Sequence, residues 1–319
     1  MGNRLSVIIT NYNYLRYLPS AVESVRNQEP DELIVVDDGS TDGSVEWLRS
    51  TRGITKLICK ANGGQASAMN AGYRVSTGDL IWFLDADDIL ISGALAAVRQ
   101  VWRPGLSKVH IRCQVIDGIG RYLRLLPQKW CELPSGDLAG VYGYLGFYPS
   151  VPTSGNVYSR DFLDKVGPIP EVPYRICADA YLHDWAPLKG EIESVSTPVV
   201  GYRIHGTNNF ALREISRNEE WFRQKAVRLS TKWLVVRSLA KIPHWVVRGL
   251  FMLSPDYLDT TKKISAFQKN ERDRIEITVP TPSYILDLAL SFLRISFIYP
   301  IYCRFWLAFT WTVYKITRS

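Results

Sequence analysis

Residues 80–88 read Leu-Ile-Trp-Phe-Leu-Asp-Ala-Asp-Asp and form the most informative segment of the chain. The first five residues, Leu80–Leu84, are all apolar, which is typical of a strand that is buried on both faces of a sheet. Three carboxylates follow within four positions, at Asp85, Asp87 and Asp88. An apolar strand that ends in acidic residues predicts an inner strand of an α/β sheet with polar chemistry at its carboxyl end.

The chain before residue 80 alternates predicted strands with predicted helices. Apolar, β-branched runs predict strands at Leu5–Thr10, Glu32–Val36 and Thr55–Cys59. Apolar residues at helical spacing predict helices at Leu15–Asn27, Ser44–Ser50 and Gly64–Val75. This order predicts a Rossmann-like, mostly parallel sheet that is flanked by helices on both faces. Ligands of such sheets bind beyond the carboxyl ends of the strands, where this chain carries Thr10–Tyr12, Asp37–Gly39 and Asp85–Asp88.

Two common nucleotide-binding loops are missing from the sequence. No Gly-x-Gly-x-x-Gly run follows the first predicted strand and no Walker A sequence occurs, which argues against a dinucleotide dehydrogenase and a P-loop enzyme. Gly63 and Gly64 open a predicted helix, and a helix N-terminus is suited to face an anion. A turn that starts the helix explains these glycines equally well.

The length and composition indicate a globular chain of about two domains. The chain has 319 residues, of which 46% are hydrophobic and 22% charged. We expect one domain at residues 1–214, with a first half at about 1–105 and a second half at about 106–214, and a separate region at 215–319. Five cysteines without a Cys-x-x-Cys pair argue against a zinc ribbon or a disulfide framework and favour a reducing, cytoplasmic compartment.

The positive charge is concentrated in the C-terminal third. Residues 1–214 hold 21 basic and 23 acidic side chains, whereas residues 215–319 hold 17 and 8, a net charge of +9. A solvated helix face, nucleic-acid binding and attraction to a membrane surface are three explanations of this excess. No zinc-finger or RNP motif supports a nucleic-acid partner, and the aromatic residues favour a membrane surface.

Two acidic clusters follow predicted strands. Asp85, Asp87 and Asp88 repel one another and need a cation or full solvation. Mg²⁺ and Mn²⁺ take oxygen ligands and share them with substrate phosphates, whereas an acidic surface turn is the alternative. Asp37 and Asp38 sit at a strand end, where a carboxylate can accept hydrogen bonds from a nucleobase or ribose. Helix capping explains the residues after them, with Thr41 or Asp42 as the cap.

A third candidate group lies downstream. Asp179, between two alanines, begins a predicted helix, and helix capping explains it as well as catalysis does. His205 lies between a predicted strand and Gly206-Thr207-Asn208. A metal ligand, a phosphate donor and a purely structural histidine are the three interpretations of this residue.

Taken together, Ser6–Asn13, Val35–Asp42 and Phe83–Asp88 resemble, in order and spacing, the family 2 glycosyltransferases with the GT-A fold. Ser154-Gly155-Asn156 and Asp179 extend the resemblance to about residue 210. The resemblance implies a nucleotide-diphosphate sugar donor, with a UDP-sugar favoured, and Mn²⁺ or Mg²⁺ as cofactor. It also implies inverting transfer to an acceptor hydroxyl, in bacterial-type assembly of a cell-surface polysaccharide or glycolipid.

The resemblance also assigns roles to residues. Thr10 and Tyr12 would frame the nucleoside, and Asp38 would bind the base with Asp37 beside it. The further nucleotide-sugar contacts implied are Gln65, Asn70 and the Asp-x-Asp motif of Asp85, Ala86 and Asp87. Asp87 would hold the metal, with Asp85 and His205 as further candidate ligands, and Asp85 or Asp88 would face the ribose. Asp179 matches the catalytic base, although Ala178 stands where the family often has Glu, and Asp184 is the rival.

The C-terminal third predicts membrane-facing helices. Lys232–Leu253 mixes aromatic, aliphatic and basic residues in the manner of interfacial helices. Ile295–Tyr314 approaches the ~20 residues of a spanning helix, but Arg304 and Pro300 interrupt it. We therefore expect helices that lie in the interface, on the inner face of the membrane, and a saccharide or lipid-linked acceptor. A helical subdomain that packs on the catalytic sheet is the alternative.

Two other functions use some of the same features. A nucleotidyltransferase also needs a carboxylate cluster for metal, but it usually has a Gly-rich basic loop early in the chain, and Thr10–Tyr17 holds only Arg16. A non-catalytic, membrane-associated scaffold is the alternative from a different class. It has no use for four carboxylates, at Asp38, Asp85, Asp87 and Asp179, near strand and helix ends.

Overall fold

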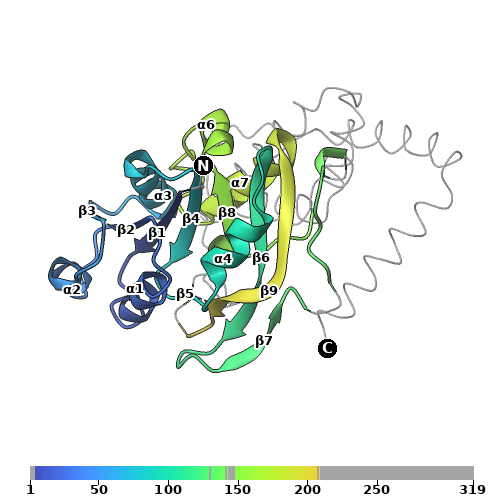
Figure 1. Ribbon diagram of the computed structural model, residues 1–319. Coiled ribbons are helices and arrows are strands. Elements are labelled where there is room, and N and C mark those ends of the chain that lie inside the picture. Colours follow the sequence, from blue (N-terminus) through green and yellow to red (C-terminus); the bar gives the residue numbers. More distant parts are fainter. Residues whose placement is uncertain (1–3, 129–130, 141, 143–147, 207, 209–319) are drawn as a thin grey trace, which may run out of the picture. The chain divides into compact units, whose positions relative to one another are not determined.

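The computed structural model describes residues 4–128, 131–140, 142, 148–206 and 208. Its elements in chain order are β1 (Leu5–Asn11), α1 (Leu18–Arg26), β2 (Glu32–Asp37), α2 (Ser44–Ser50), β3 (Lys56–Cys59), α3 (Gln65–Val75), β4 (Leu80–Asp85), β5 (Ile89–Leu90), α4 (Ala94–Val101), β6 (Leu106–Ile116), β7 (Tyr122–Leu126), the 3₁₀ turn η1 (Thr153–Gly155), β8 (Asn156–Ser159), α6 (Arg160–Val166), α7 (Ala178–Lys189) and β9 (Glu191–Arg203). The strands form one sheet in the order β3-β2-β1-β4-β8-β6-β9-β5, with β7 paired to β6 (Figure 1).

The N-terminal half of the sheet is parallel, as the alternation of strands and helices predicts. β1 pairs in parallel with β2 and β4, and β2 with β3. Asn11 lies opposite Asp37, and Thr10 lies opposite Asp85. The polar residues at the strand ends therefore lie along one edge of the sheet. The helix after β1 begins at Leu18 rather than Leu15, and a proline occupies its first turn. Backbone N–H groups have no partner within the helix there, so the N–H that proline lacks costs no hydrogen bond.

The second half of the sheet is mixed in direction. β8 runs antiparallel to β4 and β6, whereas β9 runs parallel to β6 and antiparallel to β5. The sequence pattern did not reveal β6, because Lys108, His110 and Arg112 interrupt its apolar residues although all three are buried. A buried strand that carries charged residues does not show the continuous apolar run of a central strand.

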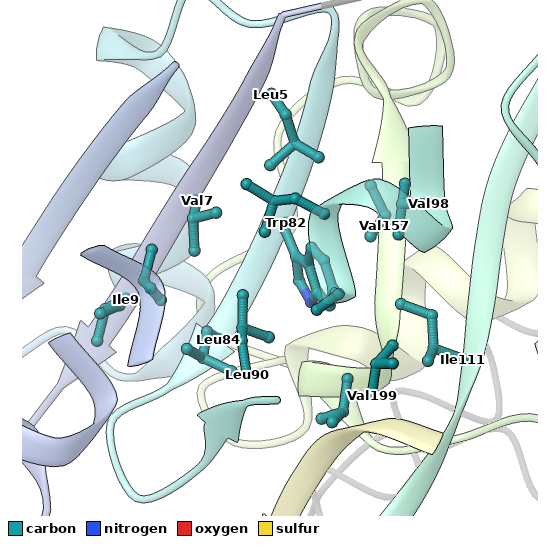
Figure 2. Packing of buried hydrophobic residues seen from close by; sticks show 14 of the residues in the cluster. Leu5, Val7, Ile9, Trp82, Leu84, Leu90, Val98, Ile111, Val157 and Val199 are labelled. Atoms are coloured by element: carbon teal, nitrogen blue, oxygen red, sulfur yellow. The ribbon is translucent and has the colours of Figure 1, made fainter. Parts of the chain in front are cut away.

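Apolar clusters cover both faces of the sheet. Val7 and Ile9 of β1 belong to one cluster, and Ile8 between them belongs to the other. Trp82 of β4 lies fully buried in the first cluster (Figure 2), where its Nε1 donates to the Ser154 carbonyl at 2.8 Å. Because alternate side chains of β1 and β4 point to opposite faces and both faces are covered, these strands are apolar at nearly every position.

Two titratable side chains of β6, Lys108 and His110, are fully buried. Lys108 Nζ donates to Tyr148 Oη at 2.8 Å and to Ser150 Oγ at 2.9 Å, and burial lowers the pKa of Lys108 well below its usual value. His110 accompanies it on β6, with Nε2 at 2.8 Å from the Pro134 carbonyl. Burial and then the Lys108 charge lower the pKa of His110 to about 3. His110 is therefore neutral in the folded protein at physiological pH.

Acid should destabilise the fold partly through His110. The unfolded chain binds a proton on this imidazole below its ordinary pKa of 6.5, whereas the folded protein does not bind one until about pH 3. Stability therefore falls as the pH drops from 6.5 towards 3. Between pH 7 and 4.5, we expect His110 to account for a loss of about 2 kcal/mol in the free energy of unfolding. Denaturant unfolding at both pH values should show a smaller loss in His110→Gln, and an equal loss would contradict the expectation.

The helices expected at 232–253 and 295–314 lie outside the described residues. Within the part of the chain that is described, no helix is both long enough and apolar enough to cross a membrane.

Candidate active site

A cavity of about 780 Å³ lies at the carboxyl edge of the parallel strands. The ends of β1, β2 and β4, the start of α3, η1, residues around the start of α7 and the end of β9 contribute to its wall. Eight predicted site residues line it: Thr10, Tyr12, Asp38, Gln65, Asp85, Ala86, Asp87 and Asp179. Asp37, Asn70 and His205 are not part of the described wall. The fold thus brings together residues that are up to 169 positions apart in the chain.

Asp87 is held by residues at and after the end of β9. Its Oδ2 lies 3.0 Å from His205 Nε2 and 3.0 Å from Asn208 Nδ2. Arg203 Nε donates to the Asp87 carbonyl at 2.7 Å. The His205 ring stacks on Tyr17 with 4.5 Å between centroids. The carboxylate is therefore fixed in position while it still lines the cavity, and His205 lies beside it as a hydrogen-bond partner. The predicted role of His205 as a metal ligand stays a prediction.

Asp85 lies in an environment with excess negative charge. Its Oδ1 accepts from Gln65 Nε2 at 3.1 Å, and its backbone N–H donates to Ser154 Oγ at 3.0 Å. Burial, followed by the charges of Asp87 and Asp179, raises the pKa of Asp85 to about 7. Carboxylates that raise one another's pKa form a site that a cation would stabilise.

Asp88 differs from its two acidic neighbours. It is 1% exposed, and its Oδ1 accepts from the Arg203 N–H at 2.7 Å. It is not part of the described wall, whereas Asp85 is. Of the two candidates to face the ribose, Asp85 is therefore the one that the cavity exposes.

The start of α3 binds the chain's own Asp38. Asp38 Oδ2 accepts from Gly64 N at 2.7 Å, and Oδ1 accepts from Gly63 N at 3.0 Å and from Lys60 Nζ at 2.6 Å. Gly64 has a φ of +88°, and a Cβ on it would collide with Arg175. Gly63 and Gly64 therefore bind an anion, which is one of the two interpretations that the sequence left open. The anion is the chain's own Asp38 carboxylate.

Asp37 and Asn70 support the cavity from outside its wall. Asp37 is fully buried, and its carboxylate accepts from Asn11 Nδ2 at 2.7 Å and Ser40 N at 2.8 Å. Asn70 exchanges two hydrogen bonds with the backbone of Ile169, at 2.8 and 3.0 Å. Asp37 and Asn70 thus bind other parts of the fold, so the geometry does not favour a direct contact of either side chain with a nucleotide sugar.

Asp179 lies in the first turn of α7. The N-cap position belongs to Cys177, with a φ of 65°, so Asp179 does not occupy the capping position that the sequence left open. The rival carboxylate, Asp184, accepts from Tyr142 Oη at 2.8 Å and is not part of the described wall. His183, one helical turn after Asp179, does line the cavity. The geometry therefore favours Asp179 over Asp184 as the carboxylate that would contact an acceptor in the cavity.

Several residues of the wall were not predicted from the sequence. Arg175 is the only Lys or Arg among the described wall residues, and its Nη2 donates to Asn62 Oδ1. It lies on an irregular segment before α7, where no periodicity marks it. Asn208, the partner of Asp87, follows the predicted His205 closely, but only its position in the fold shows what it contacts.

Gln65 joins the two halves of the site. Its Nε2 donates to Asp85, and its Oε1 accepts from the Ala178 N–H at 3.0 Å, at the start of α7. The predicted contact of Gln65 with the nucleotide sugar stays a prediction; Gln65 lines the cavity and lies between Asp85 and the start of α7. Gln65 is therefore a residue that positions both groups.

Gln65→Leu should loosen the start of α7. The substitution keeps the approximate size but leaves the Ala178 N–H without its side-chain acceptor, which costs about 1–3 kcal/mol. We expect that loss in the free energy of unfolding and faster hydrogen exchange at the Ala178 amide. Gln100→Leu, on the exposed face of α4, is the matched control. Unchanged exchange at Ala178 would contradict this role.

The donor set fits a divalent cation that is shared with a substrate. Within the described residues no group of three or more His, Cys, Asp or Glu side chains is arranged to hold a metal. Mg²⁺-type sites commonly use one or two carboxylates and complete their coordination with water and substrate phosphates. Asp85 and Asp87 supply two carboxylates at one cavity, which is within the number that such shared sites use.

Comparisons with known proteins agree with this geometry. The sequence profile of glycosyl transferase family 2 matches residues 6–109. An uncharacterized glycosyltransferase of Nostoc sp. is 36% identical over 233 residues, which cover 70% of this chain and 71% of that protein. The matched segment 6–109 contains Thr10 on β1, Asp38 directly after β2 and Asp87 just after the end of β4.

Solved structures share the fold. S. aureus TarS 1-349 in complex with UDP-GlcNAc aligns with a TM-score of 0.56 and 16% identity, over 86% of this chain and 94% of that one. The mannosyltransferase PcManGT from Pyrobaculum calidifontis, in complex with GDP-Man and Mn²⁺, aligns with a TM-score of 0.52 and 17% identity, over 94% and 82%. The predicted GT-A fold is thus confirmed. Because the Nostoc relative is similar over most of both chains and the family profile covers β2, β4 and nearly all of β1, this chain belongs to glycosyltransferase family 2 and is a glycosyltransferase.

Proposed function

We propose that this enzyme is a metal-dependent, inverting glycosyltransferase that moves a sugar from a nucleotide-diphosphate donor to an acceptor hydroxyl. The observation that carries the proposal is the position of four carboxylates. Asp38, Asp85, Asp87 and Asp179 come from three separate segments, after β2, at the end of β4 and in α7, and line one cavity. The charges of Asp87 and Asp179 raise the pKa of Asp85, and a structural protein gains no stability from carboxylates that repel one another in this way.

The donor would occupy the part of the cavity near the strand ends. Thr10 and Tyr12, which line the cavity, would frame the nucleoside. Asp38, which Gly63 and Gly64 bind through their N–H groups, would accept hydrogen bonds from the base or ribose. Asp85 and Asp87 would hold Mn²⁺ or Mg²⁺ against the diphosphate. That cation, when bound, neutralises negative charge on the leaving group. We favour a UDP-sugar as the donor, in line with the UDP-GlcNAc bound by the TarS structure.

The acceptor would approach from the α7 side. Asp179 would take the proton from the acceptor hydroxyl as its oxygen attacks the anomeric carbon. A single displacement of this kind inverts the anomeric carbon. The acceptor we propose is a saccharide or a lipid-linked sugar, with the enzyme bound peripherally at the inner face of the membrane in polysaccharide or glycolipid assembly.

Calorimetric titration with nucleotides tests the donor half of the proposal. UDP, GDP and dTDP would each be titrated into the protein with Mn²⁺ and, separately, with EDTA. Tight binding of one nucleotide that requires Mn²⁺ is the expected result, and it also identifies the base. If folded protein binds none of the three, the donor half of the proposal is wrong.

A further inference from the structure

The β6–β7 hairpin carries exposed apolar side chains at its tip. Ile119 is 66% exposed, Tyr122 56% and Leu123 54%. The other large apolar residues exposed in the described part of the chain, Tyr12, Val172 and Ile176, lie outside the helices and strands, and two of them, Tyr12 and Ile176, line the cavity. The hairpin extends from the lower part of the sheet in Figure 1, where β6 is the only described strand that pairs with β7. Exposed apolar residues that gather at one place indicate an interaction surface.

Two arginines accompany these apolar side chains. Arg121 and Arg124 are both exposed on the same hairpin. The salt bridges formed within the described residues include neither of them. A short segment with apolar and aromatic side chains beside cations matches the polar–apolar boundary of an anionic bilayer.

The tip is an ordered turn rather than a loose loop. Asp117 Oδ1 accepts from the N–H groups of Ile119 and Arg121, at 3.0 and 2.9 Å, and the Gly120 N–H donates to the Asp117 carbonyl at 3.0 Å. These hydrogen bonds present the apolar side chains in a fixed arrangement. Insertion of the tip into a bilayer interface would therefore cost little conformational entropy.

The same turn is joined to the site of Asp87. Arg203 Nη1 donates to the Asp117 carbonyl at 3.2 Å, while its Nε donates to the Asp87 carbonyl at 2.7 Å. The guanidinium also lies over the Tyr17 ring, at 5.2 Å from its centroid. A surface that holds the hairpin would therefore hold the adjoining wall of the cavity at a fixed distance from that surface.

We propose that the hairpin tip, residues 117–124, docks on an anionic phospholipid bilayer through Ile119, Tyr122 and Leu123, with Arg121 and Arg124 on the headgroups. The tip is a narrow turn with three exposed apolar side chains, whereas a stable protein–protein interface buries about 800 Å² on each partner. A fluid interface accepts a narrow apolar wedge, and anionic headgroups complement the two arginines. This surface belongs to the catalytic domain and is distinct from residues 215–319.

Vesicle binding of the full chain tests the proposal. Co-sedimentation would use vesicles of phosphatidylcholine with phosphatidylglycerol and vesicles of phosphatidylcholine alone. Arg121→Gln with Arg124→Gln should weaken binding to the anionic vesicles by about fivefold for each arginine and reduce its sensitivity to salt. Tyr122→Ser with Leu123→Ser should weaken binding by about tenfold. Hydrogen exchange on vesicles should show protection at residues 117–124.

Matched controls separate the hairpin from the rest of the surface. Val172→Ser with Arg52→Gln makes equivalent changes at exposed positions elsewhere, and this variant should bind vesicles as the parent does. Thermal unfolding checks that every variant is folded. Hairpin variants that bind vesicles as the parent does would overturn the proposal. A change in sedimentation velocity without a change in vesicle binding would also overturn it, in favour of contact between copies of the chain.

Discussion

Asp87→Asn should abolish the dependence of nucleotide binding on Mn²⁺. The substitution keeps the size of the side chain and an oxygen for His205, but it removes the charge that a cation would bind. One charge pair at ~4 Å is worth about 4 kcal/mol at an effective dielectric constant near 20. We therefore expect the affinity for the nucleoside diphosphate, measured by calorimetry with Mn²⁺, to fall by about 10²–10³-fold, towards its value in EDTA.

Asp161→Asn is the matched control for this loss of charge. Asp161 is exposed and pairs with Lys165 at 2.6 Å, on α6 and outside the cavity wall. It should bind nucleotide as the parent does. If Asp87→Asn also keeps Mn²⁺-dependent binding at the parent affinity, Asp87 does not hold the metal.

Asp179→Asn should slow sugar transfer while donor binding persists. General-base catalysis typically contributes about 10²–10⁴-fold, because the base removes the proton as the acceptor oxygen attacks. The amide of Asn cannot take that proton. We expect the rate of nucleoside diphosphate release from a bound donor, measured with an acceptor, to fall by about that factor. Calorimetry should show nucleotide affinity within a few-fold of the parent, because we place the nucleotide at the opposite side of the cavity.

Asp184→Asn discriminates between the two acids of α7. Asp184 accepts a hydrogen bond from Tyr142, and Asn keeps an oxygen for it. Turnover of this variant should stay near that of the parent. Full turnover in Asp179→Asn, with loss in Asp184→Asn, would reverse the assignment of the base.

The parallel half of the fold could be predicted because burial on both faces leaves a continuous apolar run in the sequence. Leu80–Leu84 and Leu5–Thr10 show this pattern, and their polar successors lie at the edge where the cavity forms. β6 could not be predicted in the same way. Its Lys108 and His110 are buried by partners from distant segments, such as Tyr148, and a local pattern carries no information about such partners.

The candidate site was predictable to the extent that its residues directly follow strands. Asp85 and Asp87 belong to this class. The roles of Gln65 and Asn70 could not be predicted, because the direction of a helical side chain relative to a cavity depends on how the helix packs. Arg175 was missed for a different reason. It reaches the site through an irregular segment that packs against Gly64, a contact between residues 111 positions apart.

Anomalous scattering at the manganese edge, from crystals grown with Mn²⁺ and the nucleoside diphosphate that binds, tests the central claim most directly. The claim is that the carboxylates of the cavity bind a nucleotide diphosphate through a divalent cation. We predict one strong anomalous peak within coordination distance of the Asp87 carboxylate and of a diphosphate oxygen, at about 2.0–2.2 Å as for other small divalent ions. A nucleotide that occupies the cavity with no manganese beside Asp87, or a peak elsewhere on the protein, would contradict it.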